Sequence, residues 1–159
     1  MPEGADAATE LRREHDEIEN LATRLAGLEP SPERTRLVRE VSARFLTHAH
    51  AEARYLYPAL RRFLPEGPED AVRQTRQDEA TERIMRSIIE TREDDADYEA
   101  LVAQFVLDIQ RHIEAQESVL IPALVDFCTR EEINHLGRQL RDGLSSERAS
   151  HTLKPSEHD

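Results

Sequence analysis

Two stretches of the chain repeat one pattern, and this repeat constrains the fold more than any other feature. Each stretch places a His ten residues before a Pro-Ala-Leu tripeptide, at His48 in the first copy and at His112 in the second. A carboxylate follows the His in both copies, Glu52 after four residues and Glu117 after five. The repeat predicts two similar segments that face each other across one pseudo-symmetric core.

The spacing within each copy decides which side chains can share a metal ion. A helical residue turns by about 100°, so His48 and Glu52 point the same way, one turn apart. Histidine and carboxylate side chains are common ligands of transition metals. In the second copy Gln116 is the residue stacked on His112, whereas Glu117 lies beside that line and has to reach across. Both Gln116 and Glu117 are therefore candidates from this segment.

Composition narrows the class of protein. The chain has 159 residues, 34% of them charged and only 5 of them Gly, which favours a single domain of long helices. The formal net charge of -12 argues against binding to nucleic acid or to an anionic membrane. The single cysteine, Cys128, excludes an intrachain disulfide and a cysteine-based zinc site. Without a signal-peptide pattern or a long apolar run, the sequence predicts a soluble cytoplasmic protein.

Apolar periodicity predicts the helices. Four long amphipathic helices, joined by short connections, are expected at about residues 7–27, 32–64, 69–91 and 98–126. Such a series is typical of an all-α, up-down-up-down four-helix bundle.

A proline, a capping box and a polar end complete this prediction. Pro58 lies inside the second helical pattern and is expected to bend or loosen the helix there. The capping box from Thr129 to Glu132 predicts a short fifth helix that ends at about Leu144. The sequence from Ser145 onward is polar, so we expect a bundle domain over residues 1–144 and a disordered tail over residues 145–159.

A third histidine belongs to the first expected helix. His15 falls on the apolar stripe formed by Leu11, Ile18 and Leu25, although its neighbours in sequence are acidic. Its place on the stripe favours a ligand that points inward. By contrast, His50 points about 200° away from His48 and is expected at the surface.

At this point the sequence resembles the hemerythrin-like family, also called the HHE cation-binding domain. Three motifs carry the resemblance: Glu-His-Asp at His15, His-x3-Glu before Leu-Tyr-Pro at His48, and His-x4-Glu before Leu-Ile-Pro at His112. The resemblance covers about residues 8–142 and implies a non-haem iron centre, usually of two irons, inside the bundle. Members of this family bind or sense dioxygen, handle nitric oxide or peroxide, or store iron.

The resemblance also implies ligands. His15 matches the family's histidine in the first helix. His48 and Glu52 match the His–Glu pair of the second helix, and His112 and Glu117 match the pair of the fourth. Glu52 and Glu117 would then bridge two non-haem irons. A single iron, manganese or zinc ion remains an alternative.

The third helix departs from the family pattern, which places one or two histidines there. This chain has no histidine between His50 and His112. The apolar residues that follow Asp78 have the same spacing as those that follow His15, so Asp78 is the first choice for a replacement ligand, with Glu82 and Glu79 behind it. A carboxylate would favour the oxidised metal and disfavour reversible dioxygen carriage. Otherwise the site holds one ion, or the metal has been lost and the fold kept.

These observations predict an iron protein that binds, senses or reacts with dioxygen, peroxide or nitric oxide. The missing histidine would leave a coordination position open, so peroxide breakdown or sensing is expected before oxygen transport. Binding or sensing is favoured over enzymatic turnover. The expected partner is a small diatomic or peroxide ligand, without nucleic acid or membrane, in a monomer or homodimer. The alternative is a metal-free or mononuclear helical module that serves protein interactions.

Overall fold

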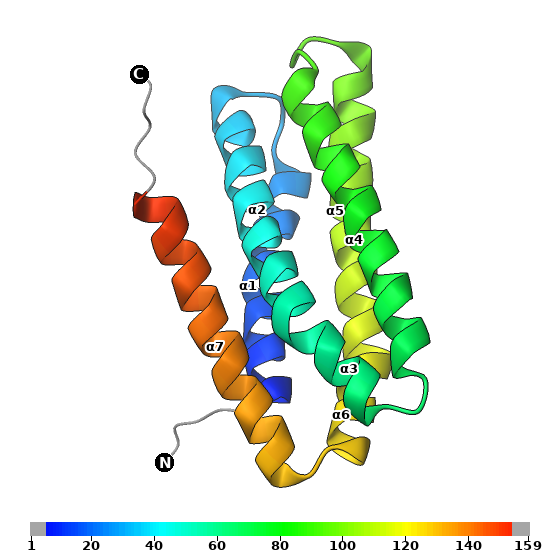
Figure 1. The fold of residues 1–159 in the computed structure, drawn as a ribbon. Helices are drawn as coiled ribbons and strands as arrows, with labels where there is room; N and C mark the ends of the chain where they lie inside the picture. The colour runs from blue at the N-terminus through cyan, green and yellow to red at the C-terminus, as the bar shows by residue number, and fades with distance from the viewer. Residues whose placement is uncertain (1–5, 154–159) are drawn as a thin grey trace.

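The computed structural model of the chain describes residues 6–153, with side chains described up to residue 147. Every described element is helical (Figure 1). In chain order they are α1 (Ala7–Gly27), α2 (Pro32–Ala51), the π-helix η1 (Glu52–Leu56), α3 (Tyr57–Phe63), α4 (Gly67–Glu90), α5 (Ala96–Ala115), the π-helix η2 (Gln116–Leu120), α6 (Ile121–Phe127) and α7 (Arg130–Leu153).

Four of these runs form the predicted bundle. The first is α1, the second joins α2 to α3 through η1, the third is α4, and the fourth joins α5 to α6 through η2. Contacts link α1 with α2 and α5, and α4 with α3 and α5. The fifth helix, α7, lies along the outside of α1 and α2 (Figure 1). The predicted all-α four-helix bundle with a fifth C-terminal helix is confirmed.

Short polar side chains begin the helices where the sequence predicted caps. Ser31 accepts a hydrogen bond from the backbone N–H of Arg34 at the start of α2. The capping box is confirmed before α7, because Thr129 and Glu132 each accept the backbone N–H of the other, at 3.1 and 2.9 Å. These bonds satisfy donors that the first turn of a helix leaves unpaired.

The fifth helix is longer than the sequence predicted. The expected disordered segment from Ser145 is wrong for residues 145–153, which continue α7 to Leu153. Neither Gly nor Pro follows Leu144 until Pro155, so nothing in the sequence stops the helix there. Residues 154–159 of the predicted tail lie outside the described residues. The expected domain boundary at residue 144 therefore falls inside a helix.

A π-helical turn precedes each repeated proline. The backbone N–H of Tyr57 donates to the carbonyl of Glu52, five residues back, and Ile121 does the same to Gln116. Pro58 and Pro122 follow directly and have no N–H of their own. The predicted disturbance at Pro58 is thus a wider turn just before the proline, and it occurs twice in equivalent places.

The wider turn changes which side chains face the core. At the α-helical angle, a residue five positions on would point about 140° away. Across the π turn, however, Tyr57 returns to the side of Glu52, and both are buried. Since π turns occur most often at functional sites, these two segments draw attention to the side chains around them.

The apolar core is divided into two clusters. One surrounds Phe45 and Phe105 at the end of the bundle where α4 meets α5, and the other surrounds Leu60 and Leu124 near α3 and α6. Along each helix the three predicted histidines fall between residues of the two clusters. His15, for example, follows Leu11 of one cluster and precedes Ile18 of the other. A buried polar layer therefore separates the two halves of the core.

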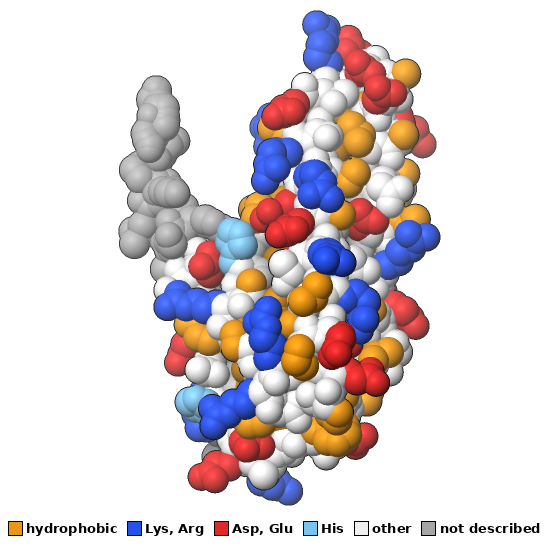
Figure 2. Space-filling view, turned by 45° about the vertical axis from the view of Figure 1, so that its right-hand side comes forward, with side chains coloured by type: hydrophobic (Ala, Val, Ile, Leu, Met, Phe, Trp, Pro, Cys, Tyr) orange, Lys and Arg blue, Asp and Glu red, His pale blue; other side chains and the backbone are white. Residues whose placement is uncertain are grey.

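The surface carries mixed charge. On the face shown in Figure 2, acidic and basic side chains are interspersed with scattered apolar ones. No helix among the described residues is both long enough and apolar enough to cross a membrane.

Candidate metal centre

Four side chains converge inside the polar layer, each from a different turn of three helical runs. They are His15 of α1, His48 of α2, Glu52 of η1 and His112 of α5. One potential ligand atom from each lies within 4.8 Å of the others, and no member is more than 3% exposed. These are four of the six ligands predicted from the sequence.

The distances fit donors that surround a common point. The Nε2 atom of His48 lies 2.7 Å from Oε2 of Glu52 and 3.4 Å from Nε2 of His112. The Nε2 atom of His15 lies 4.0 Å from the same oxygen of Glu52. Opposite donors on one ion with bonds of about 2.1 Å are about 4.2 Å apart. The cluster therefore needs only small side-chain movements to coordinate a metal.

A carboxylate lies beside the second ring nitrogen of each histidine. Nδ1 of His15 is 2.8 Å from Glu117, Nδ1 of His112 is 3.6 Å from Asp78, and Nδ1 of His48 is 3.9 Å from Glu14. A carboxylate hydrogen-bonded in this position fixes the tautomer and ring orientation of a histidine that binds a metal through its other nitrogen. Only the His15–Glu117 contact has hydrogen-bond length, and the other two carboxylates are near neighbours of their rings.

Glu117 occupies a different place from the one the resemblance implied. Its side chain is 35% exposed, and its Oε2 pairs with Nδ1 of His15 instead of joining the four converging groups. The helical spacing had indicated Gln116 as the residue stacked on His112, and it is Gln116 that lies in the interior. Gln116 is fully buried and lies at the centre of the polar layer.

Gln116 connects several members of this layer. Its side-chain amide donates to Oε1 of Glu52 at 2.9 Å and to Oε1 of Gln74 at 3.2 Å. Its own oxygen lies 3.0 Å from Nε2 of His15. Gln74, which is 4% exposed, belongs to α4 and stands one turn before Asp78. The third helix thus presents an amide and a carboxylate to the site where the family pattern has histidine.

Asp78 is the one of the three predicted replacements that approaches the cluster. It accepts a hydrogen bond of 2.6 Å from the hydroxyl of Tyr57, which also lies 3.3 Å from Glu52. Glu79 is exposed, and Glu82 pairs with His50 at the surface at 3.6 Å. Asp78 is not one of the four converging groups; it is hydrogen-bonded to Tyr57 and lies 3.6 Å from Nδ1 of His112.

Burial and charge shift the titration of these groups. Burial opposes the charge on Glu52, yet His48 and His112 hold its pKa well below the ordinary value. Burial, followed by the charge of Glu52, raises the pKa of Asp78 to about 6. For His15, burial and the neighbouring His48 lower the pKa. Burial lowers the pKa of His48, but the charge of Glu52 raises it overall, so the site favours an ionised Glu52 beside His48.

The donors present fit a transition metal. Three imidazoles and one carboxylate suit iron, manganese or zinc. In addition, Oε2 of Glu52 is buried and makes no hydrogen bond within the described part of the chain. Its charged neighbour in the metal-free chain is Nε2 of His48, at 2.7 Å. A metal ion bound here would compensate the buried negative charge directly at this oxygen.

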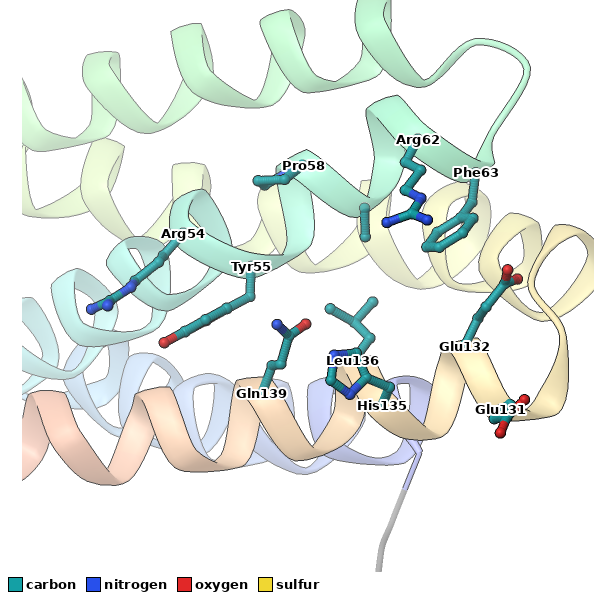
Figure 3. A pocket seen from close by; sticks show the side chains of 11 residues that line it. Arg54, Tyr55, Pro58, Arg62, Phe63, Glu131, Glu132, His135, Leu136 and Gln139 are labelled. Carbon is teal, nitrogen blue, oxygen red and sulfur yellow. The ribbon is translucent and has the colours of Figure 1, made fainter.

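A surface pocket of about 450 Å³ lies elsewhere, between α3 and α7 (Figure 3). Arg62 and Phe63 face it from α3, and His135 and Leu136 face it from α7. None of the four converging residues lines this pocket. The candidate centre is instead enclosed by the two halves of the core.

Sequence reasoning missed two residues of the site. Glu14 was not singled out as a site residue, but it is 5% exposed and lies near His48. Gln74 was not considered, although it stands four residues before Asp78 and so shares its face of the helix. That spacing was a usable signal, whereas the burial of Glu14 depends on Arg44 of α2, which donates to it at 3.2 Å.

Comparisons with known proteins agree with this picture. The model of the hemerythrin family, described as the hemerythrin HHE cation-binding domain, matches residues 6–124. The fold is similar to the crystal structure of a hemerythrin HHE cation-binding domain-containing protein from Mycobacterium kansasii, with a TM-score of 0.83. The two chains are 20% identical, and the match covers 97% of this chain and 94% of the other. A comparison with curated proteins gave no significant match.

Proposed function

Since the chain belongs to the hemerythrin HHE cation-binding family, we propose that it is a non-haem iron protein that binds, senses or reacts with dioxygen, peroxide or nitric oxide. The observation that carries the proposal is the convergence of His15, His48, Glu52 and His112 in the closed interior of the bundle. Three neutral donors and one carboxylate leave a first-row metal short of six ligands. Bound iron would supply an open coordination position and redox chemistry for a small molecule.

The chain itself would hold and shield the ion. The carboxylate of Glu117, at 2.8 Å from Nδ1 of His15, keeps that imidazole oriented. The two apolar clusters exclude bulk water from the polar layer. Tyr57 places a hydroxyl group between Glu52 and Asp78, where it can donate a hydrogen bond to a neighbouring oxygen. These features suit a small ligand better than a large substrate.

The test is metal binding with a matched pair of histidine variants. Metal-free protein is incubated with ferrous iron without oxygen, freed of excess metal, and analysed for iron content and melting temperature. We expect bound iron and a higher melting temperature in the wild type, and loss of both in His48→Ala. His50→Ala, a 48% exposed histidine of the same helix, should bind like the wild type. Visible spectra recorded with nitric oxide or peroxide then report ligand binding.

A metal-free interaction module remains the second candidate because the polar layer is well bonded by itself. Gln116 joins Glu52, Gln74 and His15 without an ion. This reading predicts no iron after incubation and the same melting temperature with iron or chelator. Either result with folded protein would contradict the iron proposal.

A further inference from the structure

The two oxygens of Glu52 face different surroundings. Oε2 points toward His48, at 2.7 Å, and toward His15, at 4.0 Å, and it has no hydrogen bond among the described residues. Oε1 instead accepts the amide of Gln116 at 2.9 Å and lies 3.3 Å from the hydroxyl of Tyr57. Oε1 also lies 3.4 Å from Nε2 of His112, but it is already occupied by its hydrogen bonds, so Oε2 is the oxygen of this carboxylate without a hydrogen bond.

The orientation of the Gln116 amide is fixed by its partners. The amide nitrogen has two oxygen acceptors, on Glu52 and on Gln74, and an NH₂ group is the only end that can donate to both. Its oxygen is consequently turned toward Nε2 of His15, at 3.0 Å. An amide nitrogen that donates hydrogen bonds does not bind a metal, so this end of Gln116 closes the Oε1 side of Glu52.

The histidines do not divide into two sets. The ring centroids of His15, His48 and His112 are 5.1, 5.5 and 6.0 Å apart, so the three rings surround one point at similar distances. A two-metal site, with ions about 3.5–4 Å apart, needs donors for each ion. On the far side of Glu52 the available groups are the amides of Gln74 and Gln116 and the Asp78–Tyr57 pair. Gln116 is bonded to both Gln74 and Glu52, and Asp78 Oδ2 is bonded to Tyr57, so Asp78 Oδ1 is the one oxygen of these groups that is buried without a hydrogen bond among the described residues.

From these contacts we infer that the centre holds one metal ion per chain, and that Gln116 sets this number. The amide nitrogen of Gln116 takes the place beside Glu52 Oε1 that a second ion would need, while the amide oxygen lies 3.0 Å from Nε2 of His15. The inference rests on the proposed function, since it concerns how many ions the same site accepts. It replaces the expected pair of irons bridged by Glu52 and Glu117 with a single ion.

The experiment counts metal per folded chain in the wild type and in Gln116→Glu. This variant keeps the size of the side chain but replaces the amide with a second carboxylate, matching Glu52 in the equivalent place. Metal-free proteins are loaded with ferrous iron or with zinc, and the metal content is measured together with the electron paramagnetic resonance spectrum of the oxidised iron form. Gln110→Glu, an exposed change on the same helix, is the control.

We expect one ion and the spectrum of an isolated ferric centre in the wild type and in Gln110→Glu. In Gln116→Glu the count should approach two, with the signal diminished by coupling between the ions. Two ions in the wild type would overturn the inference even if Gln116→Glu failed to fold. One ion in both proteins would overturn the role of Gln116. No metal in folded wild type would instead overturn the proposed function on which the inference rests.

Discussion

The two repeated segments have the same backbone but different chemistry. Each runs from a buried histidine through one α-helical turn, then through a π turn into Pro-Ala-Leu. At the first turn one copy has Glu52 and the other has Gln116, and after the π turn one has Tyr57 where the other has Ile121. Glu52 is thus the structural counterpart of Gln116. The sequence repeat had instead matched Glu52 with Glu117, which lies one position further along the chain.

This difference shows how a symmetric frame holds an asymmetric site. Both histidines and both buried turns are retained, but only one of the two facing side chains carries a charge. A second buried carboxylate would repel the first in the absence of a cation. Gln116 donates a hydrogen bond to Glu52 instead, so the layer stays bonded with a single negative charge at its centre.

The largest effect on metal binding is expected from Glu52→Gln, which gives both copies of the repeat a glutamine in the equivalent position. Glu52→Gln removes the single carboxylate among the four converging groups. We expect metal affinity to fall by more than about 100-fold, since loss of outer partners alone costs up to that factor. Metal titration with dialysis measures the change. Glu40→Gln, exposed on the same helix, should bind like the wild type, and retained binding in Glu52→Gln would remove Glu52 from the site.

Asp78 lies on the Glu52 side of the polar layer, and its titration should make the stability of the metal-free protein depend on pH. Its pKa rises from 3.8 to about 6, first through burial and then through Glu52. The folded chain therefore holds this proton more tightly than the unfolded chain. The resulting stabilisation is fully present below pH 3.8 and is lost as pH rises through about 6. In free energy of unfolding this amounts to at most about 3 kcal/mol.

Urea unfolding of metal-free protein at several pH values tests this expectation. The stability of the wild type relative to Asp78→Asn should fall as pH increases over that interval, because the opposite contribution of Glu52 is common to both proteins. Asp126→Asn, an exposed change on α6, should follow the wild type. Parallel curves for wild type and Asp78→Asn would contradict the assignment.

A substitution of Glu117 tests whether this residue binds the metal directly or orients the ligand His15. If Glu117 acts through Nδ1 of His15, Glu117→Gln should weaken metal binding by about 10–100-fold without abolishing it. Affinity is measured by competition with a chelator, and metal count is measured at saturation. Glu114→Gln, exposed on the same helical run, is the control. A lower count at saturation in Glu117→Gln would restore Glu117 as a direct ligand.

The smallest effect concerns the position where the copies have Tyr57 and Ile121. Tyr57→Phe removes the hydroxyl between Glu52 and Asp78 and keeps the ring in the core. We expect a loss of about 1–2 kcal/mol in the free energy of unfolding, because Asp78 loses a buried hydrogen bond. Tyr55→Phe, a half-buried neighbour, should change stability less. Equal losses in chemical denaturation would mean that the hydroxyl of Tyr57 has no special role.

The sequence by itself determined the helical frame and the main polar pairs. Apolar periodicity gave the helices, and the capping box at Thr129 gave the start of α7. The four-residue spacing placed His48 with Glu52, and the apolar stripe turned His15 inward. These features are local: they depend on residues within a few turns of one another, so the order of side chains along the chain is sufficient to predict them.

Tertiary structure decided the features that depend on separate helices. Glu117 pairs with His15 across 102 positions of the chain, and Glu14 is buried because Arg44 of another helix covers it. The place of α7 along α1 and α2 likewise depends on contacts between helices that are far apart in the chain. A buried polar group is stable only where its partners are, and those partners become neighbours only when the bundle is assembled.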